Sequence, residues 1–527
     1  MFARRAILFC ALISLGAAAS AQKSGGAPEQ LGKVSFPTSC QPAAQPTFER
    51  GVALLHSFWF SQSERAFQEV LARDPECAIA GWGIAAALIG NTFATGPNPA
   101  QASRAKEAIE RARGTSRKSE RELNFIEAVA QYYDLYPGRP HGQRMKALAD
   151  AFEIVAKRYP QDDEAQIFHA VYLTATQPLT DQTYAAALKA AAILEEQFKK
   201  HPDHPGVAHY LIHSYDYPSI ADKGMDAARR YSEIAPSAPH ALHMPSHIFT
   251  RVGAWKDSAQ INERSAAAAR ETQDPNDGLH AMDYAVYAYL QLGQDAQARR
   301  VMKEAVEVKN VIPTVRSGPY ALAAIPARIA LERGAWQEAA KLEPQESQFP
   351  YAKSQTHYAR ALGAARAGNP AAAEADVKQL ASIVEGLKGK DAYWATEVEV
   401  QHLTGLAWVE FANGNRDKGL ALMRSAADTE DANEKSTVTP ARMLPARELL
   451  GDMLLAAGKP AEALGEYEKS QVREPNRYRG LYGAGQAAAQ ANQPDKARYY
   501  FGKLSEMAGD GLRESDLQAV RQYLARN

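Results

Sequence analysis

Six histidines in the middle of this 527-residue chain have spacings that could support chemistry. They form two pairs with i, i+4 spacing and two single residues close to those pairs: His209 and His213, His243 and His247, His240, and His280. Residues four apart lie on the same face of an α-helix, so each pair can present two imidazoles side by side. Neutral imidazole is a ligand for Zn, Cu, Fe and Ni alike. These histidines are therefore candidates for a divalent transition-metal site of unspecified metal.

The two pairs are offset by 34 residues, which is the period of a known helix–turn–helix repeat. Apolar residues recur at helical spacing and strand signals are almost absent, so the surrounding elements are expected to be helices. Glycines that could end the first helix of a hairpin recur along the chain: Gly253, Gly293, Gly334 and Gly414. Fuller copies of the repeat pattern are found at both ends: Gly51, Phe67 and Pro75, then Gly451, Gly458, Ala463, Tyr467 and Pro475, then Gly485, Ala497 and Phe501.

On these motifs the whole mature chain resembles tetratricopeptide-repeat (TPR) proteins. Several segments are similar to an exported bacterial family of them: Asp74-Pro75-Glu76-Cys77-Ala78 with Trp82-Gly83, His204-Pro205-Gly206, and His243-Met244-Pro245-Ser246-His247. The resemblance implies an all-α fold, a right-handed superhelical solenoid of TPR-like helix–turn–helix repeats. It also implies export, and it says little about chemistry.

The TPR frame places both histidine pairs on one helix face. With Gly253 at the fifteenth position of its repeat, His243 and His247 take the fifth and ninth positions of the first helix. In TPR proteins this face lines the concave groove that holds ligands. The candidate metal ligands are therefore His209, His213, His240, His243, His247, His280 and Asp283. Further candidates for contact with a ligand in the groove are Asp216, Glu164, Arg251 and Tyr287.

An internal comparison indicates that the fold does not require these histidines. Residues 240–255 align without gaps on residues 321–336, and a proline, a glycine and a tryptophan coincide: Pro245 with Pro326, Gly253 with Gly334, and Trp255 with Trp336. The histidines are replaced in the second stretch: His240 by Ala321, His243 by Ala324, and His247 by Arg328. We therefore expect a metal site, with a groove for a polar or anionic ligand and purely structural histidines as alternatives.

Charge and the N-terminus limit the classes of partner and the compartment. The formal net charge of −1 gives no basic footprint for nucleic acid. Residues 1–21 have the features of a secretory signal: positive charge at Arg4 and Arg5, an apolar run, and Ala19-Ser20-Ala21 as a cleavage site. We expect a periplasmic or secreted protein with no stable membrane insertion after the signal is removed.

Removing the signal leaves two cysteines, Cys40 and Cys77. An exported protein with an even pair is expected to form a disulfide, which here would tie residues 22–44 to the first helical hairpin. The rest of the chain is divided into a TPR array at 45–345, which carries the histidine cluster, and a second array at 346–527.

Three functions fit this sequence. The first is an exported binding protein whose groove holds a metal, while flanking repeats bind a protein or peptide partner. The second is a metal-dependent hydrolase with Asp216, Asp283 or Glu164 as general base. The third is a protein–protein scaffold without metal, in which the histidines sense pH. Whether the chain is an enzyme stays open, and binding is favoured over catalysis.

Overall fold

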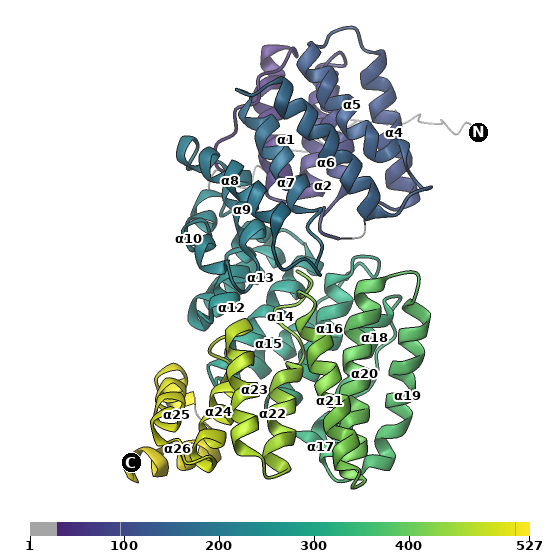
Figure 1. The fold of residues 1–527 in the computed structure, drawn as a ribbon. Coiled ribbons are helices and arrows are strands. Elements are labelled where there is room, and N and C mark those ends of the chain that lie inside the picture. Colours follow the sequence, from purple (N-terminus) through teal and green to yellow (C-terminus); the bar gives the residue numbers. More distant parts are fainter. Residues whose placement is uncertain (1–28, 95, 512, 527) are drawn as a thin grey trace, which may run out of the picture.

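A computed structural model describes residues 29–94, 96–511 and 513–526, and the predicted signal peptide at 1–21 lies outside these ranges. Within them the chain is all-α, with short connections and no strand, as expected from the sequence. The helices follow one another along the molecule, from α1–α7 at the top of Figure 1 to the C-terminal helices at the bottom. In the described ranges, none of the helices combines the length and the apolar character needed to cross a membrane.

The N-terminal part begins with a short 3-10 helix at Pro42–Ala44. It is followed by α1 (Gln45–His56), α2 (Phe60–Arg73), α3 (Ile79–Ile89), α4 (Pro99–Gly114), α5 (Glu120–Asp134), α6 (His141–Arg158), α7 (Asp163–Thr174), α8 (Ala185–Lys200), α9 (Pro205–Tyr215), α10 (Met225–Ile234), α11 (Pro239–His243), α12 (Pro245–Val252) and α13 (Trp255–Glu271). A second 3-10 helix, Ala221–Gly224, precedes α10.

The remaining helices are α14 (Pro275–Gln291), α15 (Asp295–Glu307), α16 (Ser317–Glu332), α17 (Trp336–Ala339), α18 (Pro350–Arg366), α19 (Pro370–Leu387), α20 (Ala392–Ala412), α21 (Arg416–Asp431), α22 (Ala446–Ala456), α23 (Pro460–Arg473), α24 (Tyr478–Gln490), α25 (Pro494–Ala508) and α26 (Glu514–Arg526). A third 3-10 helix, Gly509–Gly511, follows α25.

The hairpins pack through a small residue on the first helix and an aromatic ring on the second. A Cβ atom added at Gly51 would lie 2.8 Å from the ring of Phe67. The same relation holds near the C-terminus, where a Cβ at Gly451 would lie 2.7 Å from Tyr467. Because only glycine lets the two helices approach this closely, the repeat copies predicted at both ends of the chain are confirmed.

The turn glycines also have the backbone that the frame requires. Gly253 and Gly293 both have φ of +71°, in the left-handed region that favours glycine. Gly293 has a second reason to lack a side chain, because a Cβ there would lie 2.0 Å from the carbonyl oxygen of Gly511. The end of the chain therefore returns to contact the middle repeats.

The apolar core does not divide at residue 345. One large cluster of buried side chains runs from Leu31 to Ile261, and another runs from Tyr320 to Val520. A smaller cluster between Ala266 and Ile329 links them. The boundary drawn from the sequence at 345/346 falls inside the second cluster, because the repeats stack continuously through that point.

The leading segment is tied down by the predicted disulfide. Cys40 and Cys77 are joined, with their Cα atoms 4.7 Å apart. Phe36 from the same segment is fully buried, with its ring centroid 5.3 Å from that of Trp82 in α3. The segment therefore adds both a covalent link and an aromatic contact to the first hairpins, as expected.

An irregular stretch between α21 and α22, residues 433–445, runs through the inside of the array and is called the inner segment below. All of its residues are buried except Thr437, which is half-buried. Tyr284 of α14 donates a hydrogen bond to the Thr439 carbonyl at 3.1 Å, and Arg328 of α16 donates to the Arg442 carbonyl at 3.2 Å. In Figure 1 the segment reaches the middle helices near α14 and α16. The open concave groove expected from the TPR frame is therefore filled here by the chain itself.

Candidate metal centre

Four helices bring the six histidines together at the inside of the array. α9 carries the first pair, α11 and α12 carry the second pair, and α14 carries the last histidine. The two helices of the second pair are separated at Pro245, which begins α12. Since Pro326 lies inside the continuous helix α16, a proline at this position does not by itself divide the helix.

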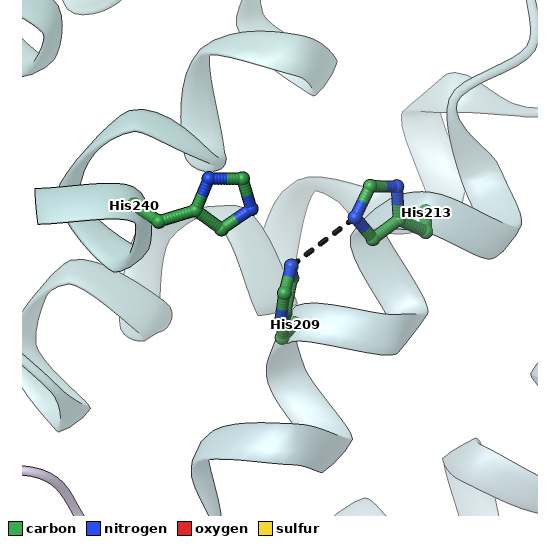
Figure 2. Close-up of side chains that lie close together, drawn as sticks. All are labelled: His209, His213 and His240. Carbon is green, nitrogen blue, oxygen red and sulfur yellow. Dashed lines mark hydrogen bonds between the residues drawn. The ribbon is translucent and has the colours of Figure 1, made fainter. Parts of the chain in front are cut away.

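The first triplet consists of His209, His213 and His240, whose candidate ligand atoms lie within 4.8 Å of one another. Figure 2 shows the three rings arranged around one space, with His209 and His213 joined through their Nε2 atoms at 3.1 Å. Two nitrogens bound to one zinc ion at its usual bond length lie about 3.3 Å apart. The pair therefore already has the spacing of two ligands on one ion.

The second triplet consists of His243, His247 and His280, and its ligand atoms also lie within 4.8 Å of one another. The Nε2 atoms of His243 and His247 are 3.1 Å apart, the same distance as in the first pair. The ring centroids of His243 and His280 are separated by 4.3 Å. The structure thus brings together all six histidines predicted from the sequence, and it sorts them into two groups of three.

Hydrogen bonds to the other ring nitrogens assign the protons of the second pair. His243 Nδ1 lies 2.7 Å from Asn262 Oδ1, and the Asn262 amide nitrogen donates to the Ser258 carbonyl, which fixes the oxygen as the acceptor. His247 Nδ1 lies 2.8 Å from a carboxylate oxygen of Asp216. Both Nδ1 atoms therefore carry the proton. When both rings are neutral, their bare Nε2 atoms face each other 3.1 Å apart, and a shared proton or a bound metal ion would remove the repulsion between the two lone pairs. The partners of the Nδ1 atoms are those that metal-binding histidines use.

The first pair is held in a related way. His209 Nδ1 lies 2.6 Å from the carbonyl oxygen of His56, so it carries the proton and leaves Nε2 bare. Three further ring nitrogens are buried and have no hydrogen-bond partner within the described part of the chain: His213 Nδ1, His240 Nε2 and His280 Nδ1. Buried polar groups normally find a partner, so these orphaned atoms mark the cluster as incomplete on its own.

The environment keeps the histidines neutral. None of the six is more than 8% exposed, and burial lowers the pKa of each one below its ordinary value. Repulsion between neighbouring imidazolium charges lowers the pKa values of His209 and His213 further. Neutral imidazole is the form that binds metal ions, so desolvation prepares the rings as ligands.

Different side chains cover the two triplets. Phe93 stacks on His213 at 4.0 Å between centroids, and Phe58 lies 4.4 Å from His209. Phe58 adopts a positive φ of 54°, an uncommon backbone for a bulky residue that turns its ring over the first triplet. The second triplet is covered by Tyr284, whose ring centroid lies 4.7 Å from that of His243, and by the inner segment.

Asp216 and its cationic partners form a second layer behind His247. Arg251 donates to Asp216 at 2.8 Å, and Lys435 of the inner segment lies 3.7 Å from the same carboxylate. Burial alone would raise the pKa of Asp216, but Lys435 and Arg251 hold that pKa well below its ordinary value. Asp216 and Arg251 were expected to contact a ligand in the groove, and they instead orient a histidine.

Two other candidates have different partners. Asp283 was expected among the metal ligands, but its carboxylate accepts from Arg328 at 3.1 Å, because the two side chains form a fully buried ion pair. Tyr287 was expected to line the groove, but its hydroxyl accepts from Arg477, because α24 packs directly against α14 at this point. Both residues serve the packing of the array.

Glu164 belongs to a third buried group that includes His56 and His204. His56 Nε2 lies 3.0 Å from one of its oxygens and His204 Nε2 lies 3.0 Å from the other. The remaining nitrogens accept from the Tyr210 hydroxyl and the Val207 amide, so every ring nitrogen has a partner. Nothing in the local sequence pattern links His56 and His204 to Glu164, because the three residues lie far apart in the sequence.

Comparison with known proteins adds little beyond the fold. No protein-family model matches the chain, and no curated protein matches it. Among solved structures it is similar to the crystal structure of the APC/C hetero-tetramer Cut9-Hcn1, with 12% identity and a TM-score of 0.35 over 91% of this chain and 76% of that one.

A tetratricopeptide repeat protein from Parabacteroides merdae is also similar, with 11% identity and a TM-score of 0.24 over 76% of this chain and 98% of that one. The assignment of the fold rests instead on the hairpins themselves. Gly51 against Phe67 and Gly451 against Tyr467 repeat one packing relation at opposite ends of the chain. The fold is an all-α array of packed helix–turn–helix hairpins, as expected from the sequence.

Proposed function

We propose that this protein is an exported helical-repeat scaffold that binds transition-metal ions at its two histidine triplets. The observation that carries the proposal is the pair of bare Nε2 atoms of His243 and His247, 3.1 Å apart, with both Nδ1 protons committed to Asn262 and Asp216. Two buried lone pairs at this distance repel each other. A metal ion between them turns the repulsion into two bonds.

The layer behind the ligands supports the same proposal. Histidines that bind metals commonly donate their other ring proton to a carboxylate, an amide oxygen or a backbone carbonyl. Here Asp216, Asn262 and the His56 carbonyl fill those three roles. Such partners fix the tautomer and the ring orientation before any ion arrives, which lowers the cost of binding.

A metal-dependent hydrolase is less well supported than a metal-binding protein. Hydrolysis needs a carboxylate or another base that is free to take a proton from the attacking water. Asp216 is engaged by His247 and Arg251, and Asp283 is engaged by Arg328. Glu164 is engaged by two histidines. Each carboxylate considered for the role of general base therefore already serves another group.

We propose a periplasmic or secreted location and a protein or peptide partner. The disulfide between Cys40 and Cys77 fits an oxidising compartment, as does the signal-like sequence at 1–21. Helical-repeat solenoids commonly use their extended surfaces for recognition. Since the inner segment fills the face that carries the histidines, the flanking repeats are the proposed place for a partner.

Elemental analysis of untagged protein, combined with thermal melting in the presence of added metal, tests the proposal. The wild type should contain metal and gain about 2.7 kcal/mol of stability for each bound ion when the free metal concentration is 100 times the Kd. His243→Ala with His247→Ala should lose metal and lose part of this gain. His402→Ala, on α20 and outside the cluster, is the matched control and should behave as the wild type does. Equal metal content in both variants would refute the proposal.

A further inference from the structure

The two triplets touch each other. The ring centroids of His213 and His247 lie 6.0 Å apart, and those of His240 and His243 also lie 6.0 Å apart, although each of these pairs joins different triplets. Within the second triplet, His247 and His280 are 6.3 Å apart. The distances between triplets are thus no larger than distances within one, so the six rings form a single cluster.

One short helix serves both triplets. α11 supplies His240 to the first triplet and His243 to the second, three residues further along the same face. Each triplet therefore takes an i, i+4 pair from one repeat and a third ligand from the next. Because α11 is shared, two ions bound in this cluster would be neighbours with no protein layer between them.

The charge balance of the cluster limits which ions it can hold. The six candidate ligands are histidines, with no carboxylate among them, and the carboxylate that His247 contacts is that of Asp216. Its charge is already matched by Arg251 at 2.8 Å, with Lys435 at 3.7 Å. Two divalent ions would therefore add four positive charges to a site that is almost completely buried, and such charges are costly without anionic ligands.

Copper in the +1 state fits these restrictions better than a divalent ion. Two copper(I) ions bring half of the charge. Thiolate and thioether groups select copper(I) most strongly, and imidazole is also a ligand for copper. Copper(I) has a filled d shell and accepts two or three nitrogen ligands in linear or trigonal geometry. Each triplet offers that number, and the rings of Phe58, Phe93 and Tyr284 pack against the histidines, so the neighbouring phenylalanines supply no fourth ligand for a tetrahedral zinc ion.

We propose that the six histidines form one dinuclear centre that binds two copper(I) ions. The first ion is held by His209, His213 and His240, and the second by His243, His247 and His280. This inference rests on the proposed metal-binding function and specifies the metal and the number of ions. It also explains why the two triplets are built side by side in consecutive repeats.

Anaerobic titration of the full mature protein with copper(I), against a chromogenic copper(I) chelator, tests the inference. The wild type should retain two copper ions per chain, also in excess zinc(II). His243→Ala with His247→Ala should retain one, and His402→Ala should retain two. Circular dichroism of each variant checks that the helices are intact.

One ion per chain, or displacement of copper(I) by zinc(II), would overturn the dinuclear copper inference while the metal-binding proposal stands. Failure to bind any metal would overturn both.

Discussion

Two buried groups of histidines lie close together in this molecule and differ in whether every ring nitrogen has a hydrogen-bond partner. In the group of His56, Glu164 and His204, every ring nitrogen donates to or accepts from a partner. In the second triplet, His243 and His247 face each other with bare Nε2 atoms. The first triplet lies between them, because His209 donates to the His56 carbonyl and His213 lies 6.0 Å from His247 between ring centroids. The balance of protons and lone pairs, rather than the number of histidines, therefore distinguishes a structural network from a metal centre.

The largest effect is expected from disrupting the group of His56, Glu164 and His204, in which every ring nitrogen has a hydrogen-bond partner. Glu164→Ala leaves two buried imidazole N–H groups without their acceptor and should cost about 3–5 kcal/mol of stability. Urea unfolding measures this loss. The variant should still bind as much metal as the wild type per folded chain. A stable variant, or one that loses its metal, would contradict the distinction between the two groups.

A histidine outside the cluster whose two ring nitrogens both have hydrogen-bond partners should make the stability depend on pH and not on metal. His141 lies 2.7 Å from the Tyr132 hydroxyl and 3.3 Å from the Thr92 carbonyl, and burial lowers its pKa to about 4. Since the folded pKa lies below the unfolded value, its contribution to stability is complete above about pH 6.5 and is lost as the pH falls to 4, by about 3 kcal/mol.

Unfolding measured across that pH range should show a shallower slope for His141→Gln than for the wild type. Metal binding at neutral pH should be the same in both proteins. Identical slopes would mean that burial does not govern this histidine as described.

Removing the metal should lower stability only when the six-histidine cluster is intact. Chelation should lower the stability of the loaded wild type by about 2.7 kcal/mol for each bound ion when the metal had been present at 100 times its Kd. A variant with alanine at His209, His213, His243 and His247 should melt at the same temperature with and without chelator. A chelator effect that persists in this variant would place the metal elsewhere.

The smallest effect is expected from the layer behind the ligands. Asn262→Ala removes the acceptor of the His243 ring proton and should weaken metal binding by about 10- to 100-fold. Tyr210→Phe, which removes the hydroxyl that pairs with His56, should leave metal binding unchanged and cost about 1 kcal/mol of stability. Competition titrations with a chelator of known affinity separate the two outcomes.

The sequence predicts those parts of the structure that depend on local periodicity. The repeat pattern at Gly51 and Phe67 predicts a hairpin contact that the structure contains, and the histidine spacing predicts pairs on one helix face. The stretch with Ala321 and Arg328 in place of histidines is confirmed as a helix of the same array. In each case the information lies within one or two turns of helix or one repeat.

Features that depend on distant contacts could not be predicted in this way. The inner segment has no regular secondary structure, and only the folded chain brings its Lys435 close to Asp216. Asn262 lies on α13, on the second helix of a hairpin, where the repeat frame gives no reason to look for a partner of His243. Glu164 was predicted as a ligand contact or a general base. Its pairing with His56 could not be predicted, because the two residues lie on helices that are far apart in the sequence.

X-ray absorption spectroscopy of the metal-loaded wild type tests the central claim most directly. The metal-binding account predicts a first shell made of nitrogen alone, with the outer-shell scattering that imidazole rings produce, and loss of part of this signal in His243→Ala with His247→Ala. A first shell dominated by oxygen or sulfur, or an imidazole signal unchanged in the double variant, would contradict it.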